Sequence, residues 1–386
     1  MSFDRNIKLL RWHSFFTDFS LWEPLAIIYF SKISGSYTLG LSIFSIFMVS
    51  SAVFELPTGF ISDRYGRVKA LILGSLSFLI GAIFYAIGLN YWFLVFGAII
   101  QGFGRSCYSG NNDALLYDNL FSTNQIKKFE EYNGKIGSMS QIALAISALL
   151  SVSVAIFPLS FLLWASVMPQ LICLILSLRL KEVKVTNNQS GNIFSHIKIA
   201  AKNFISNINL RLISLSDIIN FGLGEAAWNF KSAFIATIWP IWAVGITQFI
   251  SNIGASFSFR LSGRILKKIS ALNVLIFDFI LSEITVLLAL IFVNIISPIL
   301  MSINSLTYGV SQVAKNKLLQ DEFTMEQRAT MGSLNSLAGS LLYGIFAVIL
   351  GIFADNFGPR NALIFQSILS FSILYFYFNL KKRSKL

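Results

Sequence analysis

Several ionisable side chains lie inside long apolar stretches of this sequence. They are Asp18, Glu23, Glu55, Arg105, Asp113, Asp217, Glu225, Asp278 and Glu283. A charge at the centre of a membrane-spanning helix costs roughly 2.5–3.5 kcal/mol on insertion scales. Such a group needs a partner, a water-filled cavity or a proton. These residues are therefore the first candidates for binding a charged ligand or carrying a proton.

Glu23 lies near the middle of its apolar run, which favours binding of a ligand or a proton over a structural role. It stands in "TDFSLWEPL", where Pro24 frees a backbone carbonyl group and permits a kink. Asp18 precedes it by five residues and, in a continuous helix, would share a face with Trp22 at i, i+4. We predict that Glu23 binds a ligand or a proton and that Asp18 contributes to the same site.

Glu225 has a similar setting in "GLGEAAWNFK". Asn229 follows it by one helical turn, at i, i+4, and Trp228 is adjacent to Asn229. Lys231 is expected to extend its long side chain to the outer edge of the membrane. Glu225 is therefore the second predicted ligand or proton site, with Asn229 beside it.

A third polar group runs from Arg105 to Asp113. Arg105 and Asn112 are seven residues apart and would share a helical face, and Asp113 could pair with Arg105. Three successive polar residues, Asn111 to Asp113, cannot all face lipid without cost, so the segment is expected to border a cavity or a neighbouring helix. Both interpretations stay open, and Arg105 and Asp113 are kept as site candidates. Asp118 is expected to be solvated or to cap a helix.

The remaining buried acids are weaker candidates. Glu55 could carry a proton or a ligand's charge, but Pro57 and Gly59 follow it closely and favour a fixed contact between helices. We therefore assign Glu55 a structural role. Asp278 and Glu283 share one apolar segment, the ninth, and are expected to need protein partners.

The composition places all these residues in a membrane protein. Of 386 residues, 55% are hydrophobic, 12% are charged and 37 are Phe. Repeated apolar runs of about twenty residues are typical of a polytopic membrane protein. The first run, residues 12–30, is too long for a signal peptide and lacks a cleavage site. Two Cys in apolar runs and two distant His predict neither a disulfide framework nor a metal site, and no cofactor is expected.

We predict an all-α integral membrane fold with twelve transmembrane helices in two six-helix, pseudo-symmetric bundles. The predicted spans are residues 10–31, 39–62, 68–89, 91–118, 133–156, 158–179, 207–230, 237–261, 271–293, 296–316, 330–353 and 359–380. The predicted domains are residues 1–180, a linker over residues 181–206 and residues 207–386. The linker has the polar centre "TNNQSG" and then apolar residues at helical spacing, which predict a short interfacial helix.

The basic residues predict the orientation of these spans. The net charge is +12, and most of the thirty Lys and Arg lie at the two termini or in even-numbered loops, as in "KKRSK" at residues 381–385. The positive-inside rule then places both termini and the even loops in the cytoplasm. The positive charge is thereby explained by topology, and no nucleic-acid partner is predicted.

The loop between the second and third spans has a distinctive spacing. It reads Gly59-x-x-x-Asp63-Arg64-x-Gly66-Arg67 and resembles the loop 2–3 signature of the major facilitator superfamily. Gly66 permits a tight turn and Gly59 would allow close helix packing. The resemblance implies that these five residues form a conformational latch, in which Asp63 pairs with Arg64 or Arg67. "ELPTG" and "SGNNDALLYDNL" resemble a bacterial subgroup of permeases and exporters.

The resemblance implies a secondary transporter that works by alternating access, with helices 1 and 7 lining its cavity. No phosphate loop of the form Gly-x-x-x-x-Gly-Lys-Ser/Thr occurs, so protons are the expected energy source. The acids suit a small cationic or amphipathic substrate. The resemblance to the bacterial subgroup implies that such a compound is exported, for example a drug, toxin, peptide-like antibiotic or siderophore, and hence a part in antibiotic resistance. A proton-coupled nutrient importer is the alternative, and a non-transporting receptor is a remote one. We expect a monomer in a bacterial cytoplasmic membrane and no enzymatic activity.

Overall fold

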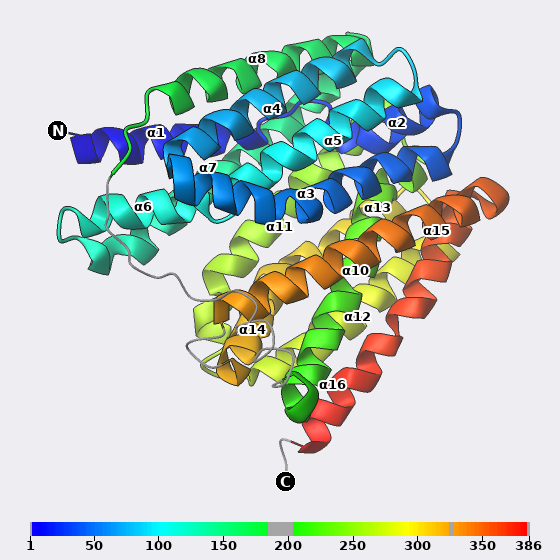
Figure 1. Cartoon of the computed structure of the whole chain (residues 1–386). Coiled ribbons are helices and arrows are strands. Elements are labelled where there is room, and N and C mark those ends of the chain that lie inside the picture. Colours follow the sequence, from blue (N-terminus) through cyan, green and yellow to red (C-terminus); the bar gives the residue numbers. More distant parts are fainter. Residues whose placement is uncertain (1, 184–203, 324–327, 384–386) are drawn as a thin grey trace. The chain divides into compact units, whose positions relative to one another are not determined.

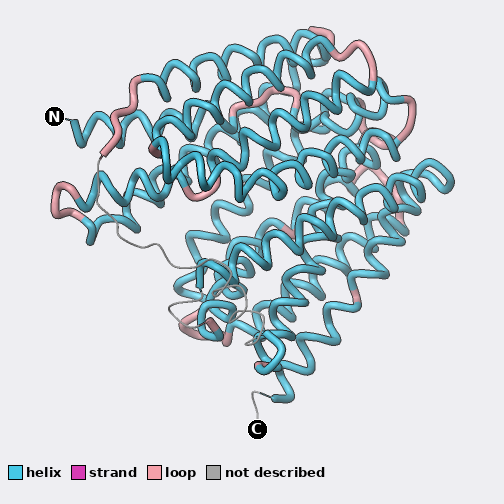
Figure 2. Tube along the Cα trace, viewed as in Figure 1, coloured by secondary structure: helices cyan, strands magenta, loops and turns pink. Residues whose placement is uncertain are grey.

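The computed structural model describes residues 2–183, 204–323 and 328–383. Within those ranges the regular structure is helical, and short connections join the helices (Figure 2). The prediction of an all-α chain is confirmed. Six described segments are long and apolar enough to cross a bilayer: residues 37–55, 67–87, 131–155, 159–178, 271–291 and 331–383.

Residue contacts divide the chain into two compact units. The first comprises Met1–Asn187 with Ile241–Phe249, and the second comprises Asn188–Pro240 with Ile250–Leu386. The predicted domain boundaries at residues 180 and 207 stay a prediction. The interfacial helix predicted in the linker falls largely in residues 184–203, outside the described residues.

The helices of the first unit occupy the first six predicted spans (Figure 1). They are α1 (Ser2–Asp18), α2 (Ala26–Ser34), α3 (Tyr37–Tyr65), α4 (Arg67–Ile87), α5 (Tyr91–Tyr108), α6 (Asn111–Phe121), α7 (Phe129–Leu150) and α8 (Leu159–Leu178). The first predicted span contains both α1 and α2, and the fourth contains both α5 and α6.

The helices of the second unit occupy the remaining predicted spans. They are α10 (Ile208–Ile235), α11 (Ile241–Ile265), α12 (Ala271–Ile291), α13 (Ser297–Ile303), α14 (Ser305–Glu322), α15 (Arg328–Ser370) and α16 (Ser372–Arg383). The start of α11 groups with the first unit. Helix α15 contains a sharp break at Gly358, whose φ is +82°, and Pro359 follows it.

In the first unit, two predicted spans contain a break; the sequence predicted a kink at Pro24 in the first of them, and it did not predict the break at Gly110 in the fourth. In the first, α1 ends at Asp18 and helical structure resumes at Glu23, where Pro24 occupies the first turn of a 3₁₀ helix. In the fourth, Gly110 separates α5 from α6 with a φ of +70°, a conformation that glycine adopts without strain. Proline and glycine therefore interrupt two helices of the first unit, and α10 in the second unit stays continuous.

Close backbone packing holds α4 against α5 in the first unit. A Cβ atom built at Gly81 would lie 3.0 Å from the carbonyl oxygen of Gly97, and one at Gly104 would lie 3.0 Å from that of Gly74. The spacing of seven residues within each helix puts both glycines on one face. These glycines let the two helices approach closely.

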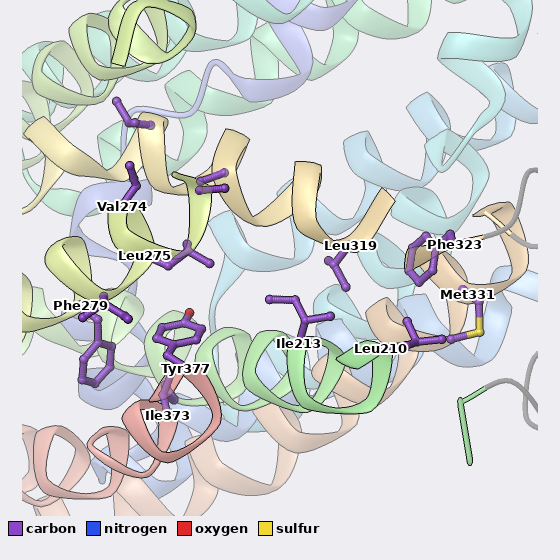
Figure 3. Close-up of a cluster of buried hydrophobic side chains, with 14 residues drawn as sticks. Leu210, Ile213, Val274, Leu275, Phe279, Leu319, Phe323, Met331, Ile373 and Tyr377 are labelled. Atoms are coloured by element: carbon purple, nitrogen blue, oxygen red, sulfur yellow. The ribbon is translucent and has the colours of Figure 1, made fainter. Parts of the chain in front are cut away.

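Apolar clusters fill the interior of each unit. In the second unit, side chains of α10, α12, α14, α15 and α16 meet around Leu210, Ile213, Leu275, Phe279 and Tyr377 (Figure 3). Close contact among such side chains gives each helix a fixed rotation about its axis. The polar residues on the same helices are thereby held in fixed directions.

Candidate functional site

The first predicted span, called helix 1 below, consists of α1 and α2 with a break between Asp18 and Glu23. Serine side chains from two other helices stabilise this break. The backbone N–H of Ser20 donates to Ser147 Oγ of α7 at 3.0 Å, and that of Leu21 donates to Ser166 Oγ of α8 at 2.9 Å. Irregular backbone at membrane depth persists only where protein groups or water satisfy it. The break is therefore a built feature of the first unit.

A glutamine satisfies the carbonyl side of the same break. Gln170 Nε2 of α8 donates to the carbonyl oxygens of Phe16 and Thr17, at 3.2 and 3.3 Å. Those carbonyls lie in the last turn of α1, where an α-helix leaves its acceptors unpaired. Together, α7 and α8 supply the hydrogen bonds that continuation of α1 would have made.

Charged side chains gather at this break. Asp18, at the end of α1, is hydrogen-bonded by Ser140, whose hydroxyl also contacts Ser14 Oγ at 2.6 Å. Asp18 lies within electrostatic range of Glu23, and Arg105 of α5 lies within range of both acids. The side chain of Glu23 is exposed. The structure thus brings three of the predicted site residues together as two acids and one base.

Trp22 does not share a helical face with Asp18, because α1 ends between them. Its side chain is 9% exposed and packs edge-on against Phe30 and Tyr85, with ring centroids 5.4 Å apart in each pair. Trp22 therefore anchors the break in the apolar interior and leaves the polar side to Glu23.

Arg105 and Asp113 are not brought together as an ion pair in the described part of the chain. The guanidinium group of Arg105 lies over the ring of Phe47, 5.7 Å from its centroid. Asp113 lies beyond the break at Gly110, in the first turn of α6, and is exposed. The same break removes the expected shared face of Arg105 and Asn112.

The second predicted site occupies α10 in the second unit. Asn229 Nδ2 donates to the hydroxyl oxygen of Tyr343 at 2.9 Å, and Tyr343 is fully buried in α15. Glu225 is half-buried and lies within electrostatic range of Tyr343 and of Tyr308 on α14. Two tyrosines thus lie within electrostatic range of Glu225.

Lys231 departs from the expectation of a side chain extending to the membrane edge. Only 6% of the residue is exposed, and its ammonium nitrogen lies 4.3 Å from the ring centroid of Trp228. A cation over an indole face is an attractive arrangement. Lys231 is therefore a buried cation in the last turns of α10.

The loop between α3 and α4 forms contacts that differ from the expected ones. Arg67 Nη1 pairs with Asp118 Oδ2 of α6 at 2.7 Å. Asp118 is 4% exposed, which corrects the expectation that it is solvated. Gly66 has a φ of +101°, as a tight turn requires. The side chain of Asp63 lies outside the described residues.

An acid from the end of the first unit binds the same loop. Glu182 accepts hydrogen bonds from the backbone N–H groups of Arg67, at 3.1 Å, and Val68, at 2.9 Å. These groups begin α4, and a carboxylate is stabilised at a helix N-terminus. The loop therefore holds the start of the predicted linker, to which Glu182 belongs.

The structure does not bear out close packing at Gly59, and the expected pairing of Arg64 stays a prediction because the side chain of Asp63 lies outside the described residues. No described atom lies within 4 Å of a Cβ built at Gly59, so Gly59 does not mark a close helix contact here. Arg64 lies near the rings of Phe60 and Tyr65. Glu55 is half-buried in α3 and has no ion pair within the described residues, so its structural role stays a prediction.

Sequence reasoning missed the residues that shape the break in helix 1. Ser140, Ser147, Ser166 and Gln170 lie in apolar spans, and such polar residues within a span signal hydrogen bonds between helices. No group of three or more His, Cys, Asp and Glu side chains is arranged to hold a metal ion in the part of the chain that the structure describes. The chemistry at the break therefore rests on carboxylate, guanidinium and hydroxyl groups.

Comparison with known proteins assigns the family. Residues 13–341 match the family described as the Major Facilitator Superfamily. An uncharacterized transporter of Buchnera aphidicola subsp. Acyrthosiphon pisum (strain APS) is 27% identical over 199 residues, 50% of this chain and 44% of that protein. One of Buchnera aphidicola subsp. Schizaphis graminum (strain Sg) is 33% identical over 116 residues, 30% of this chain and 27% of that protein. The chain thus matches less than half the length of these curated relatives.

Solved structures show the same fold. The nucleoside transporter NupG superposes with a TM-score of 0.81 at 13% identity, covering 99% of this chain and 100% of that one. A bacterial homologue of the human lysosomal transporter Spinster, inward-facing and unoccupied, gives 0.78 at 13% identity, covering 99% and 97%. A D-xylose–proton symporter gives 0.76 at 11% identity, covering 97% and 96%. The predicted fold class is confirmed.

Proposed function

This chain belongs to the major facilitator superfamily, and from that premise we propose that it exports small cationic or amphipathic compounds in exchange for protons. Its general activity is secondary transport of a small molecule across a membrane, because the family match and the similar structures are of transporters rather than enzymes. Alternating access about a site at mid-membrane is the mechanism we infer.

One observation carries this proposal: helix 1 is broken at mid-span, and its acids lie at the break. Secondary transporters use discontinuous helices for their substrate and ion sites, because unwound segments expose polar groups inside the membrane. Glu23 is exposed next to the break, and Asp18 is held by Ser140. An exposed carboxylate in this position suits an amine-bearing compound or a proton.

Exchange follows if compound and proton compete for Glu23. When Glu23 is ionised, it attracts a cationic compound; when it is protonated, that attraction is lost and the compound leaves. Arg105 lies within electrostatic range of both acids and partly balances their charge in the empty site. Asp18 and Arg105 therefore act as positioning residues, and Glu23 exchanges the proton for the compound.

The candidates Glu225, Asn229 and Asp113 have supporting functions in this proposal. Glu225 lies among hydroxyl groups in the second unit and is proposed as a proton site. Asn229 holds Tyr343 beside it.

The contacts of Arg67 with Asp118, and of Glu182 with the start of α4, support a latch at the loop between α3 and α4. Asp113 is exposed at the start of α6 and is proposed to face a water-filled space.

Proteoliposomes with an imposed pH gradient test the proposal. A pH-sensitive dye inside the vesicles reports proton movement when amine-bearing, peptide-like or sugar compounds are added. We expect proton flux driven by cationic compounds, and its loss in Glu23→Gln. Compound movement without a proton response would refute exchange. Flux that survives in Glu23→Gln would remove this residue from the mechanism.

Proton-coupled uptake is the second candidate, because one of the similar structures is a D-xylose–proton symporter. The two directions give opposite results in the same vesicles. In exchange, protons move against the compound and acidify the side that the compound leaves. In symport, protons move with the compound and acidify the side that it enters. For both we place the chain as a monomer in a bacterial cytoplasmic membrane, with its termini in the cytoplasm, as its basic residues predict.

A further inference from the structure

A row of polar side chains runs along one face of α14 in the second unit. Its members are Tyr308, Ser311, Lys315 and Glu322, at successive spacings of three, four and seven residues. This is the spacing of one helical face. A polar face along a predicted span requires partners on neighbouring helices.

Ion-pair and hydrogen-bond partners on α10 meet two members of this row. Glu322 Oε2 accepts from Asn207 Nδ2 at 2.8 Å, where α10 begins. Lys315 Nζ pairs with Asp217 Oδ1 at 2.8 Å, and their side chains are only 15% and 16% exposed. Successive polar contacts therefore lead inward from one end of this unit.

Asp278 lies on the neighbouring helix α12 and faces the polar row of α14. The hydroxyl groups of Thr307 and Ser311 of α14 lie beside its carboxylate. Its Oδ1 atom is buried without a hydrogen-bond partner, and no ion pair involves Asp278 within the described residues. A carboxylate removed from water without a cation beside it is stabilised by binding a proton. Hydroxyl groups and an unused oxygen are therefore the environment of a proton site.

Two tyrosines connect Asp278 with acids on α10. Tyr308 lies within electrostatic range of both Asp278 and Glu225. Tyr377 of α16 lies within range of both Asp278 and Asp217, and the hydroxyl group of Ser216 lies beside that of Tyr377. Through these two tyrosines, Asp278 interacts electrostatically with the surroundings of both Asp217 and Glu225.

The other helices that pack against α12 add few titratable groups near Asp278. Helix α13 carries none, as its sequence SPILMSI shows. Arg360 of α15 binds the carbonyl oxygens of Leu290 and Ile291, at the opposite end of α12 from Asp278. Among the described residues, Tyr308 and Tyr377 are the titratable groups that lie within electrostatic range of Asp278.

We propose that Asp278 is a second proton-binding residue. It exchanges its proton with Glu225 by way of Tyr308. It also exchanges its proton with the end of the unit at Asn207 and Glu322, by way of Asp217 and Lys315. The inference rests on the proton coupling proposed above and adds a route to it. The proton moves between carboxyl groups and is neither created nor consumed. Tyrosine and serine hydroxyl groups carry it by donating one proton as they accept another.

Glu283 is a second acid on α12, five residues after Asp278, and therefore provides a matched control. It also has a buried carboxylate oxygen without a hydrogen-bond partner, and Ser367 is the polar side chain beside it. No tyrosine or lysine contact connects Glu283 to the polar row in the described structure. A property shared by all buried acids would therefore appear in both residues.

Infrared spectra of the full chain in lipid test the proposal directly, without any substrate. The pH is cycled from about 5 to about 9, the range in which buried carboxyl groups titrate. We expect a carboxylic C=O band that disappears reversibly as the pH rises, that is absent in Asp278→Asn, and that persists in Glu283→Gln. Asp278→Glu should retain the band at a shifted frequency, which shows that the variants fold.

Other outcomes overturn the proposal in distinct ways. A band of Asp278 that does not change with pH makes this residue a fixed structural acid. A midpoint that moves when Na⁺ replaces choline makes it a sodium ligand. Vesicles without compound-driven proton flux, together with a titrating Asp278 band, refute the proposed exchange and leave the proton site intact. Flux in wild type that persists in Asp278→Asn removes the route and leaves the exchange intact.

Discussion

The two units hold their intramembrane charges in different ways. In the first unit, Asp18 and Glu23 lie at a break in helix 1, where the backbone is unwound and Glu23 is exposed. In the second unit, α10 runs continuously from Ile208 to Ile235, and its acids contact side chains of packed neighbouring helices. The first arrangement leaves the carboxylate of Glu23 exposed, and the second places a lysine beside Asp217 and tyrosine hydroxyl groups within electrostatic range of Glu225.

The difference teaches that similar sequence settings can serve different tasks. Glu23 and Glu225 each have a tryptophan and a second polar residue nearby, which predicts equivalent functions. Trp22 is buried in the core beside a broken helix, and Trp228 lies under Lys231 on an intact one. We therefore propose ligand binding for the break in the first unit and proton storage for the second.

Replacing Glu23 with Gln should give the largest effect. The side chain keeps its size and loses its charge, and a charged contact contributes about 1.5–3 kcal/mol. Compound-driven proton flux should therefore fall roughly ten- to a hundredfold, as a dye inside proteoliposomes reports. Glu55→Gln, on the unbroken α3, is the matched control and should keep most of the flux. Equal losses in both variants would show that the break has no special function.

Glu225→Gln should give a smaller and different effect. Flux should drop about tenfold, because one charged hydrogen bond or proton site is lost, while the affinity for a cationic compound changes less than about threefold. Parallel measurements of flux and of equilibrium compound binding separate the two quantities. A loss of binding as large as that in Glu23→Gln would place the ligand on both units and end the proposed division of tasks.

Ser147→Ala tests whether the break depends on its serine partners. The backbone N–H of Ser20 would lose its acceptor, at a cost of about 1–2 kcal/mol in the free energy of unfolding. Thermal unfolding of the purified protein should show a lower Tm and weaker compound binding. Ser138→Ala, at an exposed position of the same helix, should change neither. An unaltered Tm in Ser147→Ala would mean that water replaces the serine at no cost.

Tyr343→Phe should give the smallest effect of the series. It removes one neutral hydrogen bond from Asn229 and leaves the ring packed, so the free energy of unfolding should fall by about 0.5–1.5 kcal/mol. Tyr375→Phe, at a residue that is 67% exposed, provides the control. Tm values of both variants check the prediction. A larger loss than in Ser147→Ala would reverse the ranking of the two units.

Part of the site could be predicted from local sequence. The positions of Asp18, Glu23 and Glu225 in apolar runs marked them as costly charges, and Pro24 predicted a distortion nearby. The extent of the break was not predictable, because Ser147, Ser166 and Gln170 stabilise it from other helices. Similarly, Arg67 was assigned to the loop motif, but its partner Asp118 lies 51 residues further along the chain.

Composition and pattern alone determined that this protein is an all-α membrane protein, which segments span the bilayer and which charges need an explanation. The physical reason is that lipid penalises every exposed polar group, so length and hydropathy decide the spans locally. Only the tertiary structure decided where helix 1 unwinds, that Lys231 is buried over Trp228, and that Asp278 meets Thr307 and Ser311. Those outcomes depend on which helices pack together, and packing joins residues that the sequence keeps far apart.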